Sequence, residues 1–254
     1  MLSFRMLAPA LIALALCGTG PASAQSFTDT QRGDIEVIVR NYLIAHPEVL
    51  EEAMNELSKR QAAAEAAKHE AAITQNADTI FNSPRGVTLG NKDGDVTFVE
   101  FFDYNCGYCK RAMTDMLDLM KSDPKLKVVL KEFPVLSQGS IEAAQVAVAA
   151  RMQDASGKKY LDFHQKLLGG RGQADKARAL AAAKDAGFDM ARIEKDMASP
   201  EAKATIEENF KLAESMGMNG TPSYVIGKQV VVGAIGLDGL KEKISAARCG
   251  KATC

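Results

Sequence analysis

The 254-residue sequence lacks tryptophan, has only five cysteines, and has no excess of charge of either sign. Five cysteines are about two per cent of the chain, far below the roughly 8–10% of disulfide-rich scaffolds, so each cysteine has an individual role. Lys and Arg total 31 against 32 Asp and Glu. This balance disfavours a nucleic-acid-binding protein, a class that normally carries a basic excess. Ordinary hydrophobic (46%) and charged (25%) fractions exclude disordered, collagen-like and low-complexity chains.

Long hydrophobic runs are also missing. The apolar run at 6–17 is 12 residues long, shorter than the ~20 residues needed to cross a bilayer. It follows Arg5 and precedes an Ala-Ser-Ala site that ends at Ala24. A basic residue, a short apolar run and a small-residue site are the three parts of a secretory signal peptide. We therefore expect cleavage after Ala24 and a soluble mature protein in an oxidising compartment.

Residues 28–80 have a helical pattern with few strand signals. Pro47 suits the first position of a helix, which predicts two helices with a break at His46. Residues 61–72 are rich in alanine and predict a helix with no strong apolar face. An apolar stripe at helical spacing packs either on the rest of the chain or, as we favour, on copies of itself in a dimer or trimer. The stripe comprises Ile35, Ile38, Tyr42, Val49, Leu50, Met54 and Leu57.

The pattern changes after residue 87. The run VTFVEFF at 96–102 predicts a strand, 107–121 a helix, and 127–133 a second buried strand. Strand, helix and strand at this spacing predict a βαβ unit with a parallel strand pair. Residues 140–216 are rich in helix signals again. The closing elements predicted from the sequence are a hairpin of 223–226 and 229–232 around Gly227-Lys228, and a helix over 237–247.

A cysteine pair, Cys106-Gly107-Tyr108-Cys109, follows the first strand and opens the helix. Unpaired N–H groups and the helix dipole stabilise an anion at this end, so the pKa of Cys106 should fall into the range of roughly 3.5–7.5. Cys109, one turn later, can form or resolve a disulfide with it. We expect a redox-active Cys106–Cys109 disulfide with no other cofactor and no metal. A merely structural disulfide remains the alternative, and zinc ligation with Cys249 and Cys254 is disfavoured by the long gap between the pairs.

The run FVEFFDYNCGYC at 98–109, with Thr221-Pro222 downstream, resembles the exported DsbA-like branch of the thioredoxin superfamily, periplasmic thiol:disulfide oxidoreductases. The run NYLIAHPEV at 41–49 resembles the leader of a ScsC-like subset, of which some members oligomerise and act as disulfide isomerases. The resemblance implies an α/β thioredoxin fold with an inserted helical domain and an N-terminal helical extension. The implied segments are a signal peptide at 1–24, an oligomerisation or docking segment at 25–80, the first part of the thioredoxin fold at 81–139, the inserted domain at 140–205 and the second part of the fold at 206–254.

The resemblance also implies roles for residues around the cysteine pair. Glu100 matches a buried acidic residue that exchanges a proton with Cys109; a surface glutamate at a strand end is the alternative. Pro222 matches a cis-proline loop that places the Thr221 backbone beside Cys106, where it pairs with an extended substrate. An ordinary trans-proline turn is the alternative.

The dipeptide between the two cysteines, Gly107-Tyr108, completes the expected substrate-binding residues. It departs from the Pro-His of the strongest oxidant of the branch, because Tyr108 cannot place a positive charge beside the thiolate. We therefore expect a redox potential between about −120 mV and about −270 mV, away from the oxidising end.

The last two cysteines, Cys249 and Cys254, are expected to form a structural disulfide that clips the chain end. Free or intermolecular thiols and a redox relay are the alternatives. The remaining polar candidates, which we expect to have surface or capping roles, are His46, His69, His164, Lys110 and Glu132.

These observations lead to one functional hypothesis and two alternatives. The hypothesis is a periplasmic thiol:disulfide oxidoreductase that forms disulfides in exported proteins through its CGYC site. The first alternative is an oligomeric disulfide isomerase or reductase, and the second a copper(I)-binding metal-tolerance protein that uses the same thiolates. The expected partners are unfolded or misfolded exported proteins, a membrane protein that recycles the redox state, and further copies of the chain, with no nucleic acid.

Overall fold

The computed structural model describes residues 27–254, so the predicted signal peptide and its cleavage site lie outside the described residues. The chain divides into two compact units, Met1–Ser58 and Lys59–Cys254. We refer to them as the N-terminal unit and the C-terminal unit. Across residues 27–254, the helices are all too short or too polar to span a bilayer.

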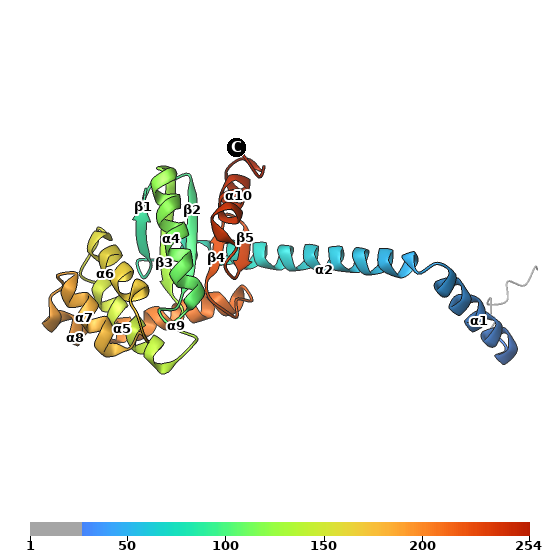
Figure 1. The fold of residues 1–254 in the computed structure, drawn as a ribbon, viewed down its shortest axis with the longest axis horizontal. Helices are drawn as coiled ribbons and strands as arrows, with labels where there is room; N and C mark the ends of the chain where they lie inside the picture. The colour runs from blue at the N-terminus through green and yellow to red at the C-terminus, as the bar shows by residue number, and fades with distance from the viewer. Residues whose placement is uncertain (1–26) are drawn as a thin grey trace, which may run out of the picture. The chain divides into compact units, whose positions relative to one another are not determined.

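The N-terminal unit contains α1 (Asp29–Ala45) and the beginning of α2 (Glu48–Gln75) (Figure 1). Thr28 caps α1 because its hydroxyl accepts the N–H of Gln31, and the Gln31 side chain accepts the N–H of Thr28 in return. The helix ends at the residue before His46 and the next begins directly after Pro47. The predicted break is therefore present, and Pro47 lies immediately before the first residue of α2.

The C-terminal unit is built on a five-stranded sheet with the strand order β1-β3-β2-β4-β5. β2 and β3 are parallel and every other neighbouring pair is antiparallel. The predicted βαβ unit and the closing hairpin are both confirmed. The edge strand β1 was not predicted. The strands are β1 (Val87–Gly90), β2 (Val96–Phe102), β3 (Leu126–Glu132), β4 (Ser223–Ile226) and β5 (Gln229–Val232).

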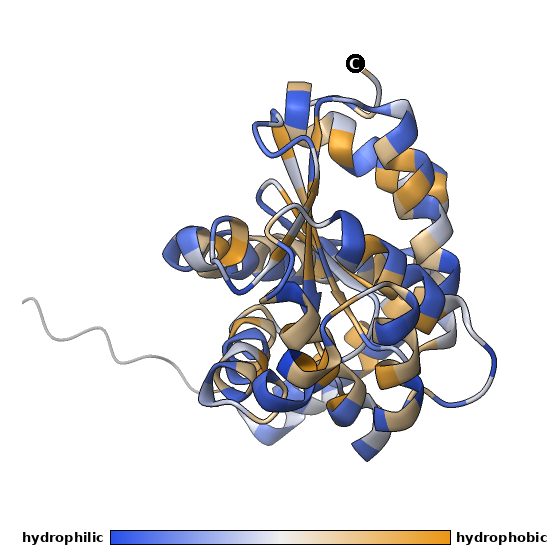
Figure 2. Cartoon of the chain, turned by 90° about the vertical axis from the view of Figure 1, so that its left-hand side faces the viewer, coloured by the Kyte–Doolittle hydropathy of each residue, from blue (hydrophilic) through white to orange (hydrophobic). Residues whose placement is uncertain are grey.

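Helices cover both faces of this sheet, and apolar strand residues lie between them (Figure 2). One face packs against α4, α10 and α5–α8. The other packs against the end of α2, α3 and α9, where Ile73, Ile80 and Leu212 are buried. The helices are α3 (Ala77–Phe81), α4 (Gly107–Ser122), α5 (Gln138–Arg151), α6 (Lys158–Gly169), α7 (Lys176–Asp185), α8 (Met190–Asp196), α9 (Pro200–Ser215) and α10 (Gly236–Cys249).

The helices α5–α8 lie between β3 and the closing hairpin in the sequence, where the inserted domain was expected. The next helix, α9, runs continuously through the predicted boundary at 205/206. Its first half contacts α5, and its second half contributes Leu212 and Ala213 to the core against the sheet. One helix therefore connects the inserted helices to the sheet.

Candidate active site

The cysteine pair lies where β2 turns into α4. The turn is short, and the N–H of Cys106 donates to the carbonyl of Asp103 at 3.0 Å. Cys106 is the N-cap of α4, and its sulfur accepts the N–H of Cys109 at 3.2 Å. Both thiols are free in this structure, and Cys109 is completely buried whereas Cys106 retains 5% exposure. Cys106 is thus the sulfur that another molecule can reach.

The pKa values of the two thiols are shifted in opposite directions. The pKa of Cys106 is lowered to about 6, chiefly because the Cys109 thiol donates a hydrogen bond to it, with help from Thr221 and from N–H groups at the start of α4. The pKa of Cys109 is raised, first by burial and then by that same hydrogen bond. At neutral pH, Cys106 is a thiolate and Cys109 a thiol, as a nucleophile and its resolving partner require.

Thr221 contacts the reactive sulfur from the other side of the site. The Thr221–Pro222 peptide bond is cis, and the Thr221 carbonyl accepts the Cys106 thiol at 3.1 Å. The Thr221 hydroxyl is buried and has no partner in this arrangement. Once Cys106 loses its proton it can no longer donate to the carbonyl, and the hydroxyl becomes a donor to the thiolate, which lowers the pKa of Cys106.

This geometry predicts the effect of Thr221→Val, which has nearly the same shape but no hydroxyl. The pKa of Cys106 should rise by about one unit, because one charge-assisted hydrogen bond to the thiolate is lost. Titration of the thiolate by its ultraviolet absorbance measures the shift. Thr221→Ser keeps the hydroxyl and serves as the matched control. Equal pKa values in the Val and Ser variants would contradict the role of the hydroxyl.

Glu100 lies beneath the pair, on the central strand β2. It is 3% exposed, so it is not a surface residue, and its side chain shares the sheet face of Phe98 and Phe102 against α4. Its pKa is raised to about 8, first by burial and then by the negative charges of Cys106 and Asp115. The Glu100 charge in turn raises the pKa of Cys109. A carboxyl group with a pKa near neutrality can release a proton to Cys109 and take it back.

Two polar residues fix the turn before Cys106, and sequence reasoning did not identify either. Asp103 is buried, and its carboxylate accepts the N–H of Asn105 at 2.7 Å, the Ser140 hydroxyl at 2.7 Å and the N–H of Leu136 at 3.0 Å. Asn105 and the backbone of Ala174 exchange two hydrogen bonds, at 2.7 and 2.8 Å. The active-site turn is thereby attached to the inserted helices. Only their position directly before the cysteines could have drawn attention to these residues.

Three residues that we expected at the surface are placed differently. Glu132 is buried at the end of β3, where it accepts the Tyr160 hydroxyl at 2.6 Å, and burial raises its pKa. His164 is buried among aromatic rings, and burial lowers its pKa to about 3. Lys110 is partly buried, and its ammonium group donates to the Gly170 carbonyl at 2.6 Å. The expectations for Glu132 and His164 were wrong because α6 packs against the sheet and buries both side chains between them. Lys110 is partly covered because the α6–α7 loop lies against the start of α4.

The tail cysteines are joined as the Cys249–Cys254 disulfide just after α10. Arg248 beside them pairs with Asp123, which follows the end of α4. Since α4 has 16 residues and begins next to Cys106, the tail lies about 24 Å from the reactive sulfur along the helix axis. The structure therefore brings Cys106, Cys109, Glu100 and the Thr221 loop together and leaves the tail pair apart. Gly107 and Tyr108 are exposed at the start of α4.

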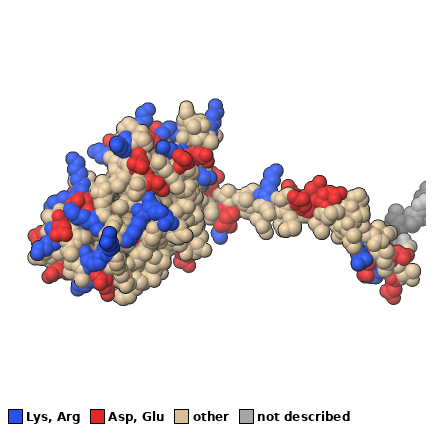
Figure 3. Space-filling view, viewed as in Figure 1, with Lys and Arg blue, Asp and Glu red and all other residues tan. Residues whose placement is uncertain are grey.

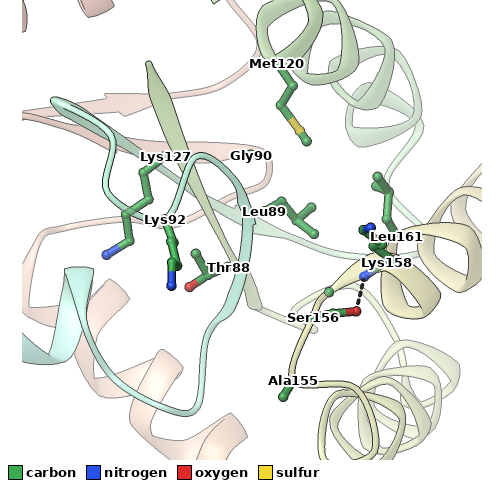
Figure 4. A pocket seen from close by; sticks show the side chains of 11 residues that line it. Thr88, Leu89, Gly90, Lys92, Met120, Lys127, Ala155, Ser156, Lys158 and Leu161 are labelled. Atoms are coloured by element: carbon green, nitrogen blue, oxygen red, sulfur yellow. Dashed lines mark hydrogen bonds between the residues drawn. The ribbon is translucent and has the colours of Figure 1, made fainter. Parts of the chain in front are cut away.

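A cavity of about 660 Å³ lies away from this site (Figure 4). It is lined by Met120 and residues of β1, and by the start of α6, where Ser156 accepts the N–H of Lys158. The ammonium group of Lys127, on the wall of the cavity, donates a hydrogen bond to the carbonyl of Phe81. Because Met120 is near the far end of α4, this cavity does not adjoin the cysteines.

A parallel βαβ core, a reactive thiolate at a helix N-terminus and a buried proton-holding carboxyl define a dithiol protein of the thioredoxin fold. The comparison with known families agrees with this class. Residues 97–245 match the model of the DSBA-like thioredoxin domain, and residues 31–64 match the ScsC N-terminal domain, described as that of a copper resistance protein. The chain belongs to the DSBA-like thioredoxin domain family, whose members are thiol:disulfide oxidoreductases.

Solved structures show the same likeness. A thioredoxin-like oxidoreductase from Silicibacter pomeroyi is 42% identical and has a TM-score of 0.64, covering 67% of this chain and 96% of that one. Proteus mirabilis ScsC in a transitional conformation is 27% identical, with a TM-score of 0.64, and covers 89% and 98%. The thiol-disulfide exchange protein α-DsbA2 of Wolbachia pipientis is 30% identical, with a TM-score of 0.66, and covers 72% and 97%.

Curated sequences give a more distant match. The Na⁺/H⁺ antiporter NhaA 1 of Salinispora arenicola is 24% identical over 161 residues, which are 63% of this chain. The match spans about a quarter (24%) of that protein's length.

Proposed function

We propose that this protein is an exported thiol:disulfide oxidoreductase that forms disulfides in periplasmic proteins through Cys106 and Cys109. The observation that carries the proposal is the difference in pKa between the partly accessible Cys106 and the fully buried Cys109. Both lie above the carboxyl group of Glu100. The expected signal peptide, cleaved after Ala24, supports the compartment. A membrane partner would restore the disulfide after each turnover.

The oxidation proceeds in two exchanges. A substrate thiolate attacks Cys106 of the Cys106–Cys109 disulfide, which forms a mixed disulfide and expels the Cys109 sulfur as a thiolate. Glu100 gives its proton to this buried thiolate. A second substrate thiolate then attacks the substrate sulfur of the mixed disulfide and releases Cys106, whose lowered pKa makes it a good leaving group. The substrate loses two electrons and the cysteine pair gains them. In the reductive direction Glu100 takes the proton back, so that Cys109 can attack.

An oligomeric isomerase is the second candidate, favoured by the surface of the N-terminal unit. The described part of α1 buries none of its residues. Its large apolar side chains remain exposed, with Ile38 at 66% and Met54 of α2 at 68%. The match to the ScsC N-terminal domain covers the same residues. An apolar face of this length is suited to association with further copies of the chain, which would place several cysteine pairs around one substrate.

A truncation separates the two candidates, and the structure shows where to cut. Ile73 is part of the C-terminal core and Glu70 pairs with Lys228, so the deletion should end at residue 58 and leave the rest of α2 in place. We expect the mature chain to be oligomeric and to refold scrambled ribonuclease. The truncated chain should be a monomer that still oxidises reduced ribonuclease but has lost the isomerase activity, as measured by solution mass and by both refolding assays.

A point variant gives the same test without a deletion. Ile38→Glu with Met54→Glu places charges on the apolar face and should dissociate the oligomer, whereas Arg40→Glu on a polar position should not. A mature chain that is monomeric and has only oxidase activity would rule out the isomerase candidate.

Copper(I) binding is a further candidate, favoured by the match of residues 31–64 to the N-terminal domain of a copper resistance protein. Soft thiolates bind copper(I), but Cys109 is completely buried, and a carboxyl group placed to move a proton would have no purpose there. Copper titration of the reduced protein beside an insulin-reduction assay distinguishes the two roles. Tight copper binding without reductase activity would favour the metal role.

A further inference from the structure

The loop between α6 and α7 is attached to the active site at two points. On one side of Cys106, the Asn105 side chain exchanges two hydrogen bonds with Ala174 at the end of the loop. On the other side, Lys110 donates to the Gly170 carbonyl at its beginning. Lys110 lies one helical turn after Cys106, whose carbonyl accepts its N–H. These hydrogen bonds hold the loop as a wall of the site.

This wall and the start of α4 carry positive charge. Lys110 and Arg178 are held by backbone carbonyls of the α6–α7 region, and the Arg111 guanidinium stacks over the Tyr108 ring at 4.5 Å. Arg171 is exposed in the middle of the loop. We call these four residues the cationic rim: Lys110, Arg111, Arg171 and Arg178. Figure 3 shows Lys and Arg side chains gathered over the part of the C-terminal unit where α4 and the inserted helices lie.

The rim charges have no carboxylate partners. Within residues 27–254 none of the four makes an ion pair, whereas cations elsewhere on the unit, such as Arg85 and Arg248, are paired. The nearby acids have other partners. Asp175 caps α7 through the N–H of Arg178, and Asp103 is buried among its own donors.

We propose that the cationic rim binds acidic residues that flank the reacting cysteine of a protein substrate, so that the inserted helices select substrates by charge. Unpaired cations on this wall and at the start of α4 attract an approaching anionic segment and repel a cationic one, and this acts mainly on the rate of encounter. The Tyr108 side chain, which has Arg111 stacked over its ring and is otherwise exposed, provides the adjoining apolar surface. This inference rests on the proposed disulfide exchange, since only such a reaction brings polypeptide cysteines to Cys106.

The test uses two disulfide-closed peptides of equal length, one with glutamates and one with lysines beside the cysteines. The reduced mature protein is mixed with each peptide, and the second-order rate constant of peptide reduction is measured at low and high salt. Each peptide is also reduced by dithiothreitol, so that its intrinsic reactivity can be divided out. We expect the wild-type protein to prefer the acidic peptide by roughly three- to tenfold at low salt, and this preference should disappear at high salt.

The variant that tests the rim is Arg111→Gln with Arg171→Gln, because neither side chain holds a backbone carbonyl. The matched control is Lys92→Gln with Lys125→Gln, which removes two exposed charges near the other end of α4. The rim variant should lose most of the preference and the control should keep it. A general change in the pKa of Cys106 would slow both peptides alike and leave their ratio unchanged.

Two results would overturn the proposal in distinguishable ways. If the wild-type protein reduces both peptides at the same corrected rate, or if the rim variant keeps the full preference, the rim does not select substrates although disulfide exchange stands. If the wild-type protein reduces neither peptide, the proposed function itself fails, and the inference that rests on it fails as well.

Discussion

Replacing Cys109 by serine is expected to convert the protein into a covalent trap for its substrates. Cys106 would still attack a substrate disulfide, but no thiol would remain beneath it to resolve the mixed disulfide. Because Cys109 is completely buried, an external thiol cannot take up its position beneath Cys106, and only the slower attack by thiols in solution remains. Mixed disulfides should therefore accumulate to nearly stoichiometric amounts. Non-reducing electrophoresis followed by mass spectrometry measures them.

The choice of replacement is itself a prediction from the hydrogen bonds of the site. The thiol of Cys109 is the largest cause of the lowered pKa of Cys106. Cys109→Ser keeps a donor at that position and Cys109→Ala does not, so the pKa of Cys106 should be higher in the Ala variant. The Ser variant should then form adducts faster near neutral pH, where the Ala variant holds less thiolate. Equal rates in the two variants would contradict this account of the Cys106 acidity.

The matched control for trapping removes the tail disulfide. Because Cys249 and Cys254 lie at the far end of α4 from the reactive sulfur, Cys249→Ser with Cys254→Ser should leave trapping by a Cys109 variant unchanged. Loss of the adducts in that background would instead support the redox relay considered from the sequence. Cys106→Ser should give no adducts in any background.

Much of this site follows from local sequence, for reasons that the structure makes clear. A short β-branched and aromatic run favours a strand, and a cysteine that follows it closely and opens a helical pattern lies at the N-terminus of the next helix. Both facts are local, so β2, α4 and the Cys106 position could be predicted. The Gly227-Lys228 loop likewise specified the hairpin, and Gly227 has the positive φ of 58° that glycine adopts without strain.

The features that sequence reasoning missed depend on distant partners. β1 is only four residues long and forms a strand because β3 pairs with it. Asn105 and Ala174 are 69 positions apart, so no spacing rule joins them. Glu132 and His164 are of polar residue types that are often exposed, and their burial depends on where the inserted helices pack. Tertiary packing overrides local preference at these positions.

Replacing Glu100 by glutamine is expected to slow the exchange step that involves Cys109 by about a hundredfold, the lower end of what a positioned acid or base contributes. The amide fills the same space but cannot give a proton to the Cys109 thiolate or take one from the thiol. Stopped-flow measurement of substrate reduction and oxidation checks this. The pH dependence near the wild-type pKa of about 8 should be lost in the variant.

Glu132→Gln is the matched control for this variant. Glu132 is also a buried carboxyl group on the same face of the sheet, and burial raises its pKa as well. Its partner is the Tyr160 hydroxyl, not a cysteine. Like Glu100→Gln, Glu132→Gln should change the free energy of unfolding, because it also replaces a buried carboxyl group. The rate of thiol–disulfide exchange should stay within about twofold of wild type, a change no larger than a surface substitution makes. Equal losses of rate in both variants would show that Glu100 acts through the fold alone.

The same variant should change how stability depends on pH. The pKa of Glu100 is about 8 in the folded protein and near 4.5 when unfolded, chiefly because of burial. Between these values the folded state binds the proton and the unfolded state does not, so rising pH destabilises the folded protein by up to about 1.4 kcal/mol per pH unit. The loss begins above about pH 4.5 and levels off above about pH 8.

The glutamine of Glu100→Gln binds no such proton, so its side chain adds no pH dependence to the free energy of unfolding. The difference in this free energy between variant and wild type should therefore shift steadily in favour of the variant as the pH rises through this window. The oxidised protein is the right form for the measurement, because its cysteines do not titrate. Burial, and after it the Asp115 charge, then raise the pKa of Glu100. Removing the Cys106 charge reduces the shift without reversing it, since burial is the larger cause. Urea unfolding at a series of pH values gives the free-energy difference. A difference that stays constant from acid to alkaline pH would mean that Glu100 ionises normally and cannot hold the proton that Cys109 needs.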